Sequence, residues 1–153
     1  MDTMQKTYSI SDVAKMSGLS TRTIRNYIKT GILNGEKVSG IWQFTSQDFC
    51  EFISNSSVKP SIQAHRNGIV YDFMRDDKKE TQKICIILDD ILDEACSQKT
   101  IEQICQMINS YDEMKEDIRF NLEKHNDNTR ILISENLNTI YDFLKKYQNL
   151  ESL

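Results

Sequence analysis

The sequence predicts an α+β fold in two small parts, and three observations lead to this prediction. Helix and turn signals are dense in the first 54 residues. Residues 54–68 are polar and contain the only proline, Pro60, which is typical of a linker. The chain after Gly68 has apolar runs with both strand and helix periods. We therefore expect an N-terminal domain over residues 1–54, a linker over 55–68 and an accessory domain over 69–150.

The composition is that of a soluble globular protein. Of the 153 residues, 39% are hydrophobic and 27% are charged. No apolar run approaches the roughly 20 residues needed to span a bilayer, and the first residues lack the apolar segment of a secretory signal. We therefore expect a cytoplasmic protein with no membrane partner. The four cysteines include no CxxC pair, which favours buried thiols over metal ligands, so no metal is predicted.

The net charge of −4 is divided unequally along the chain. Residues 1–59 hold seven basic and five acidic side chains, a net charge of +2. The remaining residues hold 12 basic and 18 acidic side chains, a net charge of −6. A surface that binds phosphate needs cations locally rather than a positive total. The division of charge therefore suggests two different roles for the two parts.

Two short helices across a tight turn are predicted near the N-terminus. Ser9 can cap the first helix, and Gly18 can adopt the positive φ that ends it. Ser20 can cap a second helix from Thr21 to about Thr30, in which Ile24, Tyr27 and Ile28 form one apolar face. The polar side chains off this face are Arg22, Thr23, Arg25, Asn26 and Lys29. Such a pair of helices is a helix-turn-helix, with cations and amides on the free face of its second helix.

A small hairpin is predicted over residues 32–44, directly after these helices. Its turns are expected at Asn34-Gly35 and Ser39-Gly40, between short apolar runs. Thr45 or Ser46 can then cap a third helix whose apolar side chains, Phe49, Phe52 and Ile53, close the core. The order of helix, turn, helix, hairpin and helix predicts a winged helix-turn-helix that binds duplex DNA.

Residues 7–53 resemble a known family. YSISDVAKMSGLSTRTIRNYIKTGIL is similar to the start of MerR-type regulators, and GIWQFTSQDFCEFI is similar to the related excisionase-type modules. The resemblance implies that the second helix enters the major groove and that the wing contacts phosphate or the minor groove. By position, Arg22 and Arg25 would be the main contacts of the helix, and Lys37 with Gln43 those of the wing. The predicted DNA-binding residues are Ser20, Thr21, Arg22, Thr23, Arg25, Asn26, Lys29, Lys37 and Gln43.

The chain departs from the MerR pattern at three positions and in one larger feature. Asn26 stands where the family usually has an aromatic residue, Ile28 where it has an acid, and Gln43 where it has an arginine. No clear long coiled-coil helix follows the wing, although MerR proteins dimerise through such a helix. The resemblance therefore does not imply the family's usual way of distorting a promoter.

The C-terminal part is predicted to be a ββαββα two-layer sandwich. Apolar runs at 69–74 and 84–88 predict the first two strands, and Thr100 can cap a helix. The alternation over 118–123 predicts a half-buried strand, followed by a turn at 125–128, a strand at 130–133 and a last helix. A helical bundle is the alternative, because Ile84, Ile87, Leu88 and Ile91 also fit a helix period.

The function predicted from these patterns is a sequence-specific DNA-binding transcription regulator of MerR-like type. No nucleophile–base motif, phosphate loop or paired metal ligands occur, so we predict no enzyme, no catalytic residues and no cofactor. The expected partners are double-stranded DNA and a second copy of the chain, joined through residues 69–150. A small-molecule effector or a protein partner for the C-terminal domain is left open. The alternatives are an excisionase-like architectural factor and a protein-interaction adaptor.

Overall fold

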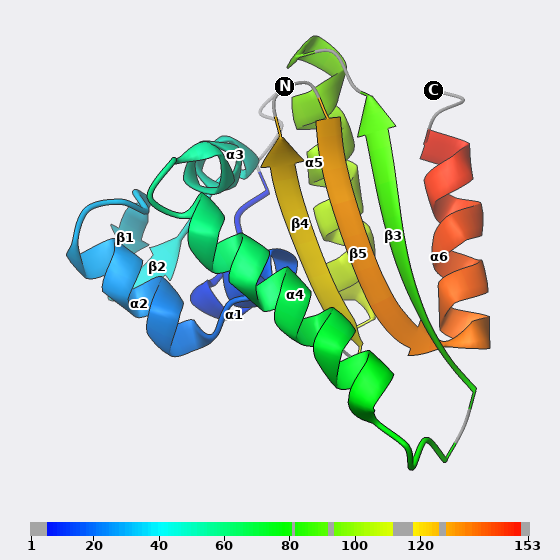
Figure 1. Ribbon diagram of the computed structural model, residues 1–153. Helices are drawn as coiled ribbons and strands as arrows, with labels where there is room; N and C mark the ends of the chain where they lie inside the picture. The colour runs from blue at the N-terminus through cyan, green and yellow to red at the C-terminus, as the bar shows by residue number, and fades with distance from the viewer. Residues whose placement is uncertain (1–5, 81, 92–93, 112–117, 126–127, 151–153) are drawn as a thin grey trace.

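The computed structural model describes residues 6–80, 82–91, 94–111, 118–125 and 128–150 (Figure 1). The helices are α1 (Ile10–Ser17), α2 (Thr21–Lys29), α3 (Ser46–Ser54), α4 (Lys59–Arg75), α5 (Glu94–Ser110) and α6 (Leu137–Leu150). The strands are β1 (Glu36–Val38), β2 (Ile41–Gln43), β3 (Lys83–Ile91), β4 (Arg119–His125) and β5 (Asn128–Asn136). Two antiparallel sheets combine with these helices, so the α+β prediction is confirmed.

The N-terminal helices begin and end where local chemistry predicts. The Ser9 amide donates to Asp12 Oδ2 at 2.9 Å, and the Asp12 amide donates to Ser9 Oγ at 3.1 Å. This reciprocal capping box starts α1, and Gly18 ends the helix at a φ of 78°. Ser20 Oγ accepts from the Thr23 amide at 3.1 Å and starts α2. The predicted helix-turn-helix is therefore formed.

The hairpin of β1 and β2 follows α2. Its turn residues, Ser39 and Gly40, have φ values of 52° and 80°, as a tight two-residue hairpin turn requires. Gly35, the other predicted turn glycine, lies against Phe44, and a Cβ on it would meet the Phe44 ring at 2.4 Å. Only a glycine therefore fits beside this buried ring.

The C-terminal sheet has the strand order β3-β5-β4, with every neighbouring pair antiparallel. Helices α5 and α6 cover one face, and α4 crosses the other (Figure 1). On the α6 side the Phe120 and Phe143 rings meet edge to face, with centroids 6.4 Å apart. Three long strands exclude the helical-bundle alternative.

The structure differs from the prediction between residues 55 and 75. The segments predicted as a linker (55–68) and as a first strand (69–74) contribute to one helix, α4. Pro60 lies in the first turn, where its missing N–H is not needed. Ile62 and Ile69 are buried two turns apart on one side of the helix. The prediction of a strand over 69–74 is therefore wrong. This short apolar run continues the amphipathic pattern of the helix, which leaves Tyr71 exposed.

The strand predicted over 118–123 is confirmed as β4, but both of its faces are buried rather than one. The polar positions Asn121 and Glu123 are only 1% exposed. Asn121 Nδ2 donates to the Ser17 carbonyl at 3.2 Å and to the Ile62 carbonyl at 3.1 Å. The Glu123 carboxylate pairs with Arg66 of α4. The polar face of β4 is therefore covered by protein, which the alternation alone could not reveal. Of the turn predicted at 125–128, residues 126–127 lie outside the described part of the chain.

The N-terminal helices pack directly on the C-terminal sheet. Helices α1 and α3 both contact β4 and α5, and one hydrophobic cluster includes buried side chains from both parts. The turn between α1 and α2 lies directly against the sheet, because a Cβ on Gly18 would come within 2.6 Å of the Phe120 carbonyl oxygen. The position of the helix-turn-helix is therefore fixed by β4.

A matched pair of glycine substitutions tests this docking. Gly18 and Gly31 have nearly equal φ values of 78° and 77°, but no atom lies within 4 Å of a Cβ added at Gly31. Gly31→Ala should lower the free energy of unfolding by about 1 kcal/mol, the cost of a left-handed alanine. Gly18→Ala should lower it by about 2–4 kcal/mol, because β4 must also move. Urea denaturation of the two variants measures the difference, and equal losses would contradict a tight contact with β4.

Candidate nucleic-acid interface

Helix α2 turns one face into the core and leaves the other in solvent. Ile24 is fully buried, and the Tyr27 ring packs edge to face on Phe52 with centroids 5.3 Å apart. The Tyr27 hydroxyl shares a 2.8 Å hydrogen bond with Ser61 of α4. These contacts fix the rotation of α2 about its axis. The exposed polar side chains of the helix are Thr21, Arg22, Arg25, Asn26 and Lys29.

The hairpin presents a cation on a rigid aromatic surface. Lys37 and Trp42 are opposite one another in the β1–β2 register. The Lys37 ammonium lies 5.7 Å from the centre of the Trp42 ring, within the range of a cation–π contact. Trp42 in turn stacks on the buried Phe44, with centroids 6.2 Å apart and an interplanar angle of 11°. The Trp42 ring is therefore held in place on the surface beside α2.

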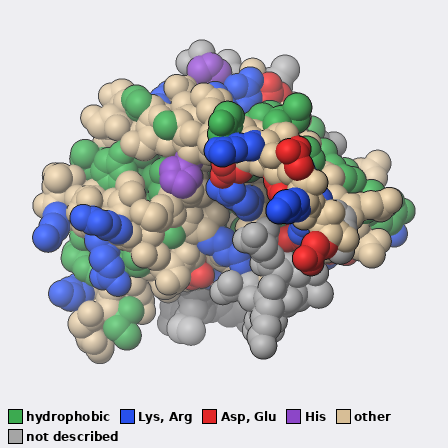
Figure 2. All heavy atoms as spheres, turned by 60° about the horizontal axis from the view of Figure 1, so that its bottom comes forward, with side chains coloured by type: hydrophobic (Ala, Val, Ile, Leu, Met, Phe, Trp, Pro, Cys, Tyr) green, Lys and Arg blue, Asp and Glu red, His purple; other side chains and the backbone are tan. Residues whose placement is uncertain are grey.

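A shallow groove lies between α2 and the hairpin. One hollow of about 320 Å³ is lined by Ile10, Arg25, Ile28, Lys29 and Trp42. A second hollow shares Ile10, Arg25 and Trp42 and adds Ser9, Ser11, Gly40 and Ile41. Lysine and arginine side chains gather at this end of the molecule, at the left of Figure 2. We refer to the two hollows together as the α2–hairpin groove.

The charge of the α2–hairpin groove is positive in the described part of the chain. Its cations are Arg25 and Lys29, and none of its lining residues is acidic. The nearby Asp12 carboxylate accepts the Ser9 amide in the capping box. No ion pair within the described residues engages Arg22, Arg25 or Lys29. These cations are therefore available to an anion.

The predicted residues fall into four structural groups. Arg25 and Lys29 line the groove, while Thr21, Arg22, Asn26 and Lys37 are exposed but do not line it. Ser20 and Thr23 hydrogen-bond to each other at 2.9 Å at the start of α2, where they cap the helix. Gln43 is half-buried opposite Glu36 at the base of the hairpin.

Sequence reasoning missed three residues that the fold brings to this groove. Ile10 and Ser11 come from the first turn of α1, and Ile41 follows the hairpin turn. The capping box at Ser9 indicated where α1 begins, but not which element its first turn faces. Only the packing of the hairpin across α1 places these residues beside Arg25.

The thiols of the described residues are buried or half-buried. Cys50 and Cys105 are buried and unpaired, and burial raises the pKa of the Cys50 thiol to about 11. Burial also raises the pKa of the half-buried Cys85. The side chain of Cys96 lies outside the described residues. Among the described side chains, no group of three or more His, Cys, Asp and Glu could hold a metal ion.

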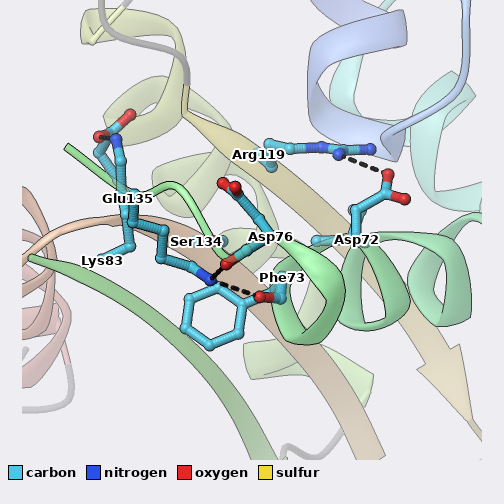
Figure 3. Close-up of a pocket in the computed structure, with 9 residues that line it drawn as sticks. Asp72, Phe73, Asp76, Lys83, Arg119, Ser134 and Glu135 are labelled. Carbon is cyan, nitrogen blue, oxygen red and sulfur yellow. Dashed lines mark hydrogen bonds and ion pairs between the residues drawn. The ribbon is translucent and has the colours of Figure 1, made fainter. Parts of the chain in front are cut away.

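A separate cavity of about 140 Å³ lies between the end of α4 and the C-terminal sheet (Figure 3). Arg119 pairs with Asp72 at 3.0 Å. Lys83 pairs with Glu135 at 2.7 Å. The Lys79 ammonium donates to two carbonyl oxygens near the end of α4, each at 2.6 Å. The cations that line this cavity are thus engaged by the protein itself.

Two helices around a glycine turn, followed by a hairpin that forms a basic groove with the second helix, define a class of DNA-binding region. Residues 9–40 match the family described as "MerR family regulatory protein". The resemblance predicted from the sequence is thereby confirmed for α1, α2 and β1. The match indicates a DNA-binding regulatory region of a family that is typically not enzymatic.

No curated protein and no solved structure matched the chain. In the described residues, no helix has the length and apolarity to cross a bilayer.

The capping role of Ser20 predicts how its substitution changes the stability of the protein. Ser20→Ala removes the acceptor of the Thr23 amide and should lower the free energy of unfolding by about 1 kcal/mol. Ser20→Asp supplies a carboxylate acceptor and should restore the stability. Thermal unfolding of both variants measures this role. An alanine variant as stable as the unchanged protein would mean that Ser20 is free to contact a ligand.

Proposed function

We propose that this protein is a cytoplasmic, sequence-specific transcription regulator that binds double-stranded DNA as a homodimer. The observation that carries the proposal is the α2–hairpin groove, in which Arg25 and Lys29 lie beside the fixed ring of Trp42. The match of residues 9–40 to MerR family regulatory proteins supports the same function.

In this proposal α2 enters the major groove of DNA. Arg22, Arg25 and Asn26 carry side chains that can read base edges, since arginine pairs with guanine and asparagine with adenine. Lys29 and Lys37 supply positive charge for contacts to the phosphate backbone, and Thr21 supplies a hydroxyl. Such phosphate contacts fix the register of the protein on the duplex. Ser20 and Thr23 act by holding the start of α2. Gln43 contacts the backbone from the base of the hairpin.

The role of the two arginines can be tested on a duplex selected from random sequences. Arg22→Ala and Arg25→Ala should each weaken specific binding by about 1–3 kcal/mol. Both side chains are exposed, so the thermal stability should remain unchanged. Fluorescence anisotropy at a fixed salt concentration measures the affinity.

Arg75→Ala is the matched control, because Arg75 is an exposed arginine at the far end of α4. It removes the same charge from another surface and should leave the affinity nearly unchanged. If all three variants bound equally well, α2 would not be the recognition helix.

The single tryptophan offers a test without substitution. Trp42 is the only tryptophan of the chain and lines the groove. Duplex DNA bound in the groove should change its emission and reduce its quenching by acrylamide, because the ring becomes shielded from solvent. Titration with DNA at low and moderate salt measures both effects, which should weaken together as salt rises. Unchanged emission at saturating DNA would place the binding surface elsewhere.

A homodimer is proposed because one helix-turn-helix reads a single half-site. Regulators that use this motif commonly pair two copies across a two-fold axis to gain affinity and specificity. The N-terminal helices are packed on β4 and α5, so we expect the second copy to bind another surface of the C-terminal part.

A further inference from the structure

The α2–hairpin groove combines an apolar floor with a positive rim. The apolar residues of its first hollow come from three elements: Ile10 from α1, Ile28 from α2 and Trp42 from β2. Each of these side chains is partly exposed. Arg25 and Lys29 line the same hollow, and none of the described lining residues is acidic. The groove therefore suits an occupant that carries negative charge beside an apolar body.

One strand of the DNA backbone has this chemistry. Its phosphates alternate with deoxyribose rings, which lack the 2′-hydroxyl of ribose. When α2 lies in the major groove, the backbone strand that borders this groove runs between the helix and the hairpin. Lys29, on the helix side, then lies beside the phosphates of that strand. Its sugars face the apolar floor.

The contacts of Trp42 favour a sugar over a base as the group that lies on this floor. The Lys37 ammonium lies over the Trp42 ring, and the buried Phe44 ring stacks on it. An unstacked base would compete with these contacts for the surface of the ring. A sugar needs only apolar contact with the groove, so the bases of the duplex remain stacked.

The hairpin side of the groove has no acceptor side chain among its described lining residues. These are Gly40, Ile41 and Trp42, and Ile41 is 63% exposed. The indole N–H of Trp42 donates hydrogen bonds but cannot accept them. A hydroxyl brought against this side would therefore lose water without gaining a side-chain acceptor for its proton.

We propose that the α2–hairpin groove holds one sugar–phosphate strand of duplex DNA with a deoxyribose against Ile41, and that this contact excludes ribose. The proposal rests on the DNA-binding function proposed above and adds the class of sugar that the groove selects. A ribose at this position buries its 2′-hydroxyl against an apolar side chain, which is costly because the hydroxyl stays unsatisfied. An RNA strand is rejected from the groove for the same reason.

A scan of single ribonucleotides tests the sugar contact. Each nucleotide of a duplex selected from random sequences is replaced in turn by its ribose form, and fluorescence anisotropy at fixed salt measures the affinity. One or two neighbouring positions of one strand should weaken binding about tenfold, the effect of an unsatisfied buried hydroxyl. The other positions should leave the affinity nearly unchanged.

A 2′-fluoro sugar at the sensitive position is the chemical control. It favours the same ring pucker as ribose but has no proton to donate. It should bind nearly as well as deoxyribose, because only the hydroxyl requires an acceptor. A loss as large as that caused by ribose would mean that the shape of the sugar, rather than the burial of a hydroxyl, decides the affinity, and would overturn the proposal.

Two serine substitutions at the hairpin tip form a matched pair. Ile41 and Val38 are opposite each other in the hairpin register and both are exposed, but Val38 does not line the groove. Ile41→Ser supplies an acceptor for the 2′-hydroxyl, so most of the tenfold preference for deoxyribose should disappear. Val38→Ser should keep the full preference. Thermal unfolding checks that both variants are folded.

The outcomes separate the sugar contact from the DNA-binding function itself. If the protein bound the selected duplex specifically but no single ribose weakened binding, the sugar contact would be wrong and the DNA-binding function would stand. Equal loss of the preference in Ile41→Ser and Val38→Ser would also overturn the contact. A protein that bound no duplex at all would contradict both proposals.

Discussion

The buried amide of Asn121 joins the parts on which the rest of the structure depends. Its Nδ2 donates to the Ser17 carbonyl at the end of α1 and to the Ile62 carbonyl in α4, while its backbone belongs to β4. A polar side chain that is 99% buried is costly unless its donors are satisfied, so these two bonds define how the three elements fit together. Gly18 permits this arrangement, because any larger residue would collide with β4.

The N-terminal elements could be predicted because each is specified by residues that are close in sequence. The capping box at Ser9, the left-handed glycine at position 18 and the cap at Ser20 act within one turn of helix. The positive φ values of Ser39 and Gly40 likewise belong to the two residues of the turn itself. Arg25 and Lys29 could be assigned to the free face because the apolar period of α2 is short and regular.

The C-terminal part was harder to predict because its decisive contacts are distant in sequence. The alternation over 118–123 predicts a solvent-facing Glu123, yet this side chain is buried against Arg66 of α4, 57 residues earlier in the chain. In the region of α4 the sequence predicts a linker followed by a strand, because Pro60 and Gly68 are typical of loops. Pro60 fits a first helical turn, and the burial of Ile62 and Ile69 under the same helix decides the outcome. Tertiary packing, rather than local propensity, selects the helix there.

The tight docking of the helix-turn-helix on β4 has a consequence for how a dimer could use DNA. If the two parts were joined by a flexible linker, the spacing of two recognition helices could adapt to different operators. Here α1, α3 and the glycine turn are packed into the same core as the sheet. The direction of α2 is therefore set by β4. The direction of β4 is in turn fixed by its pairing with β5, which also pairs with β3. Any surface of the sheet that joins two copies must then fix the distance and angle between their recognition helices.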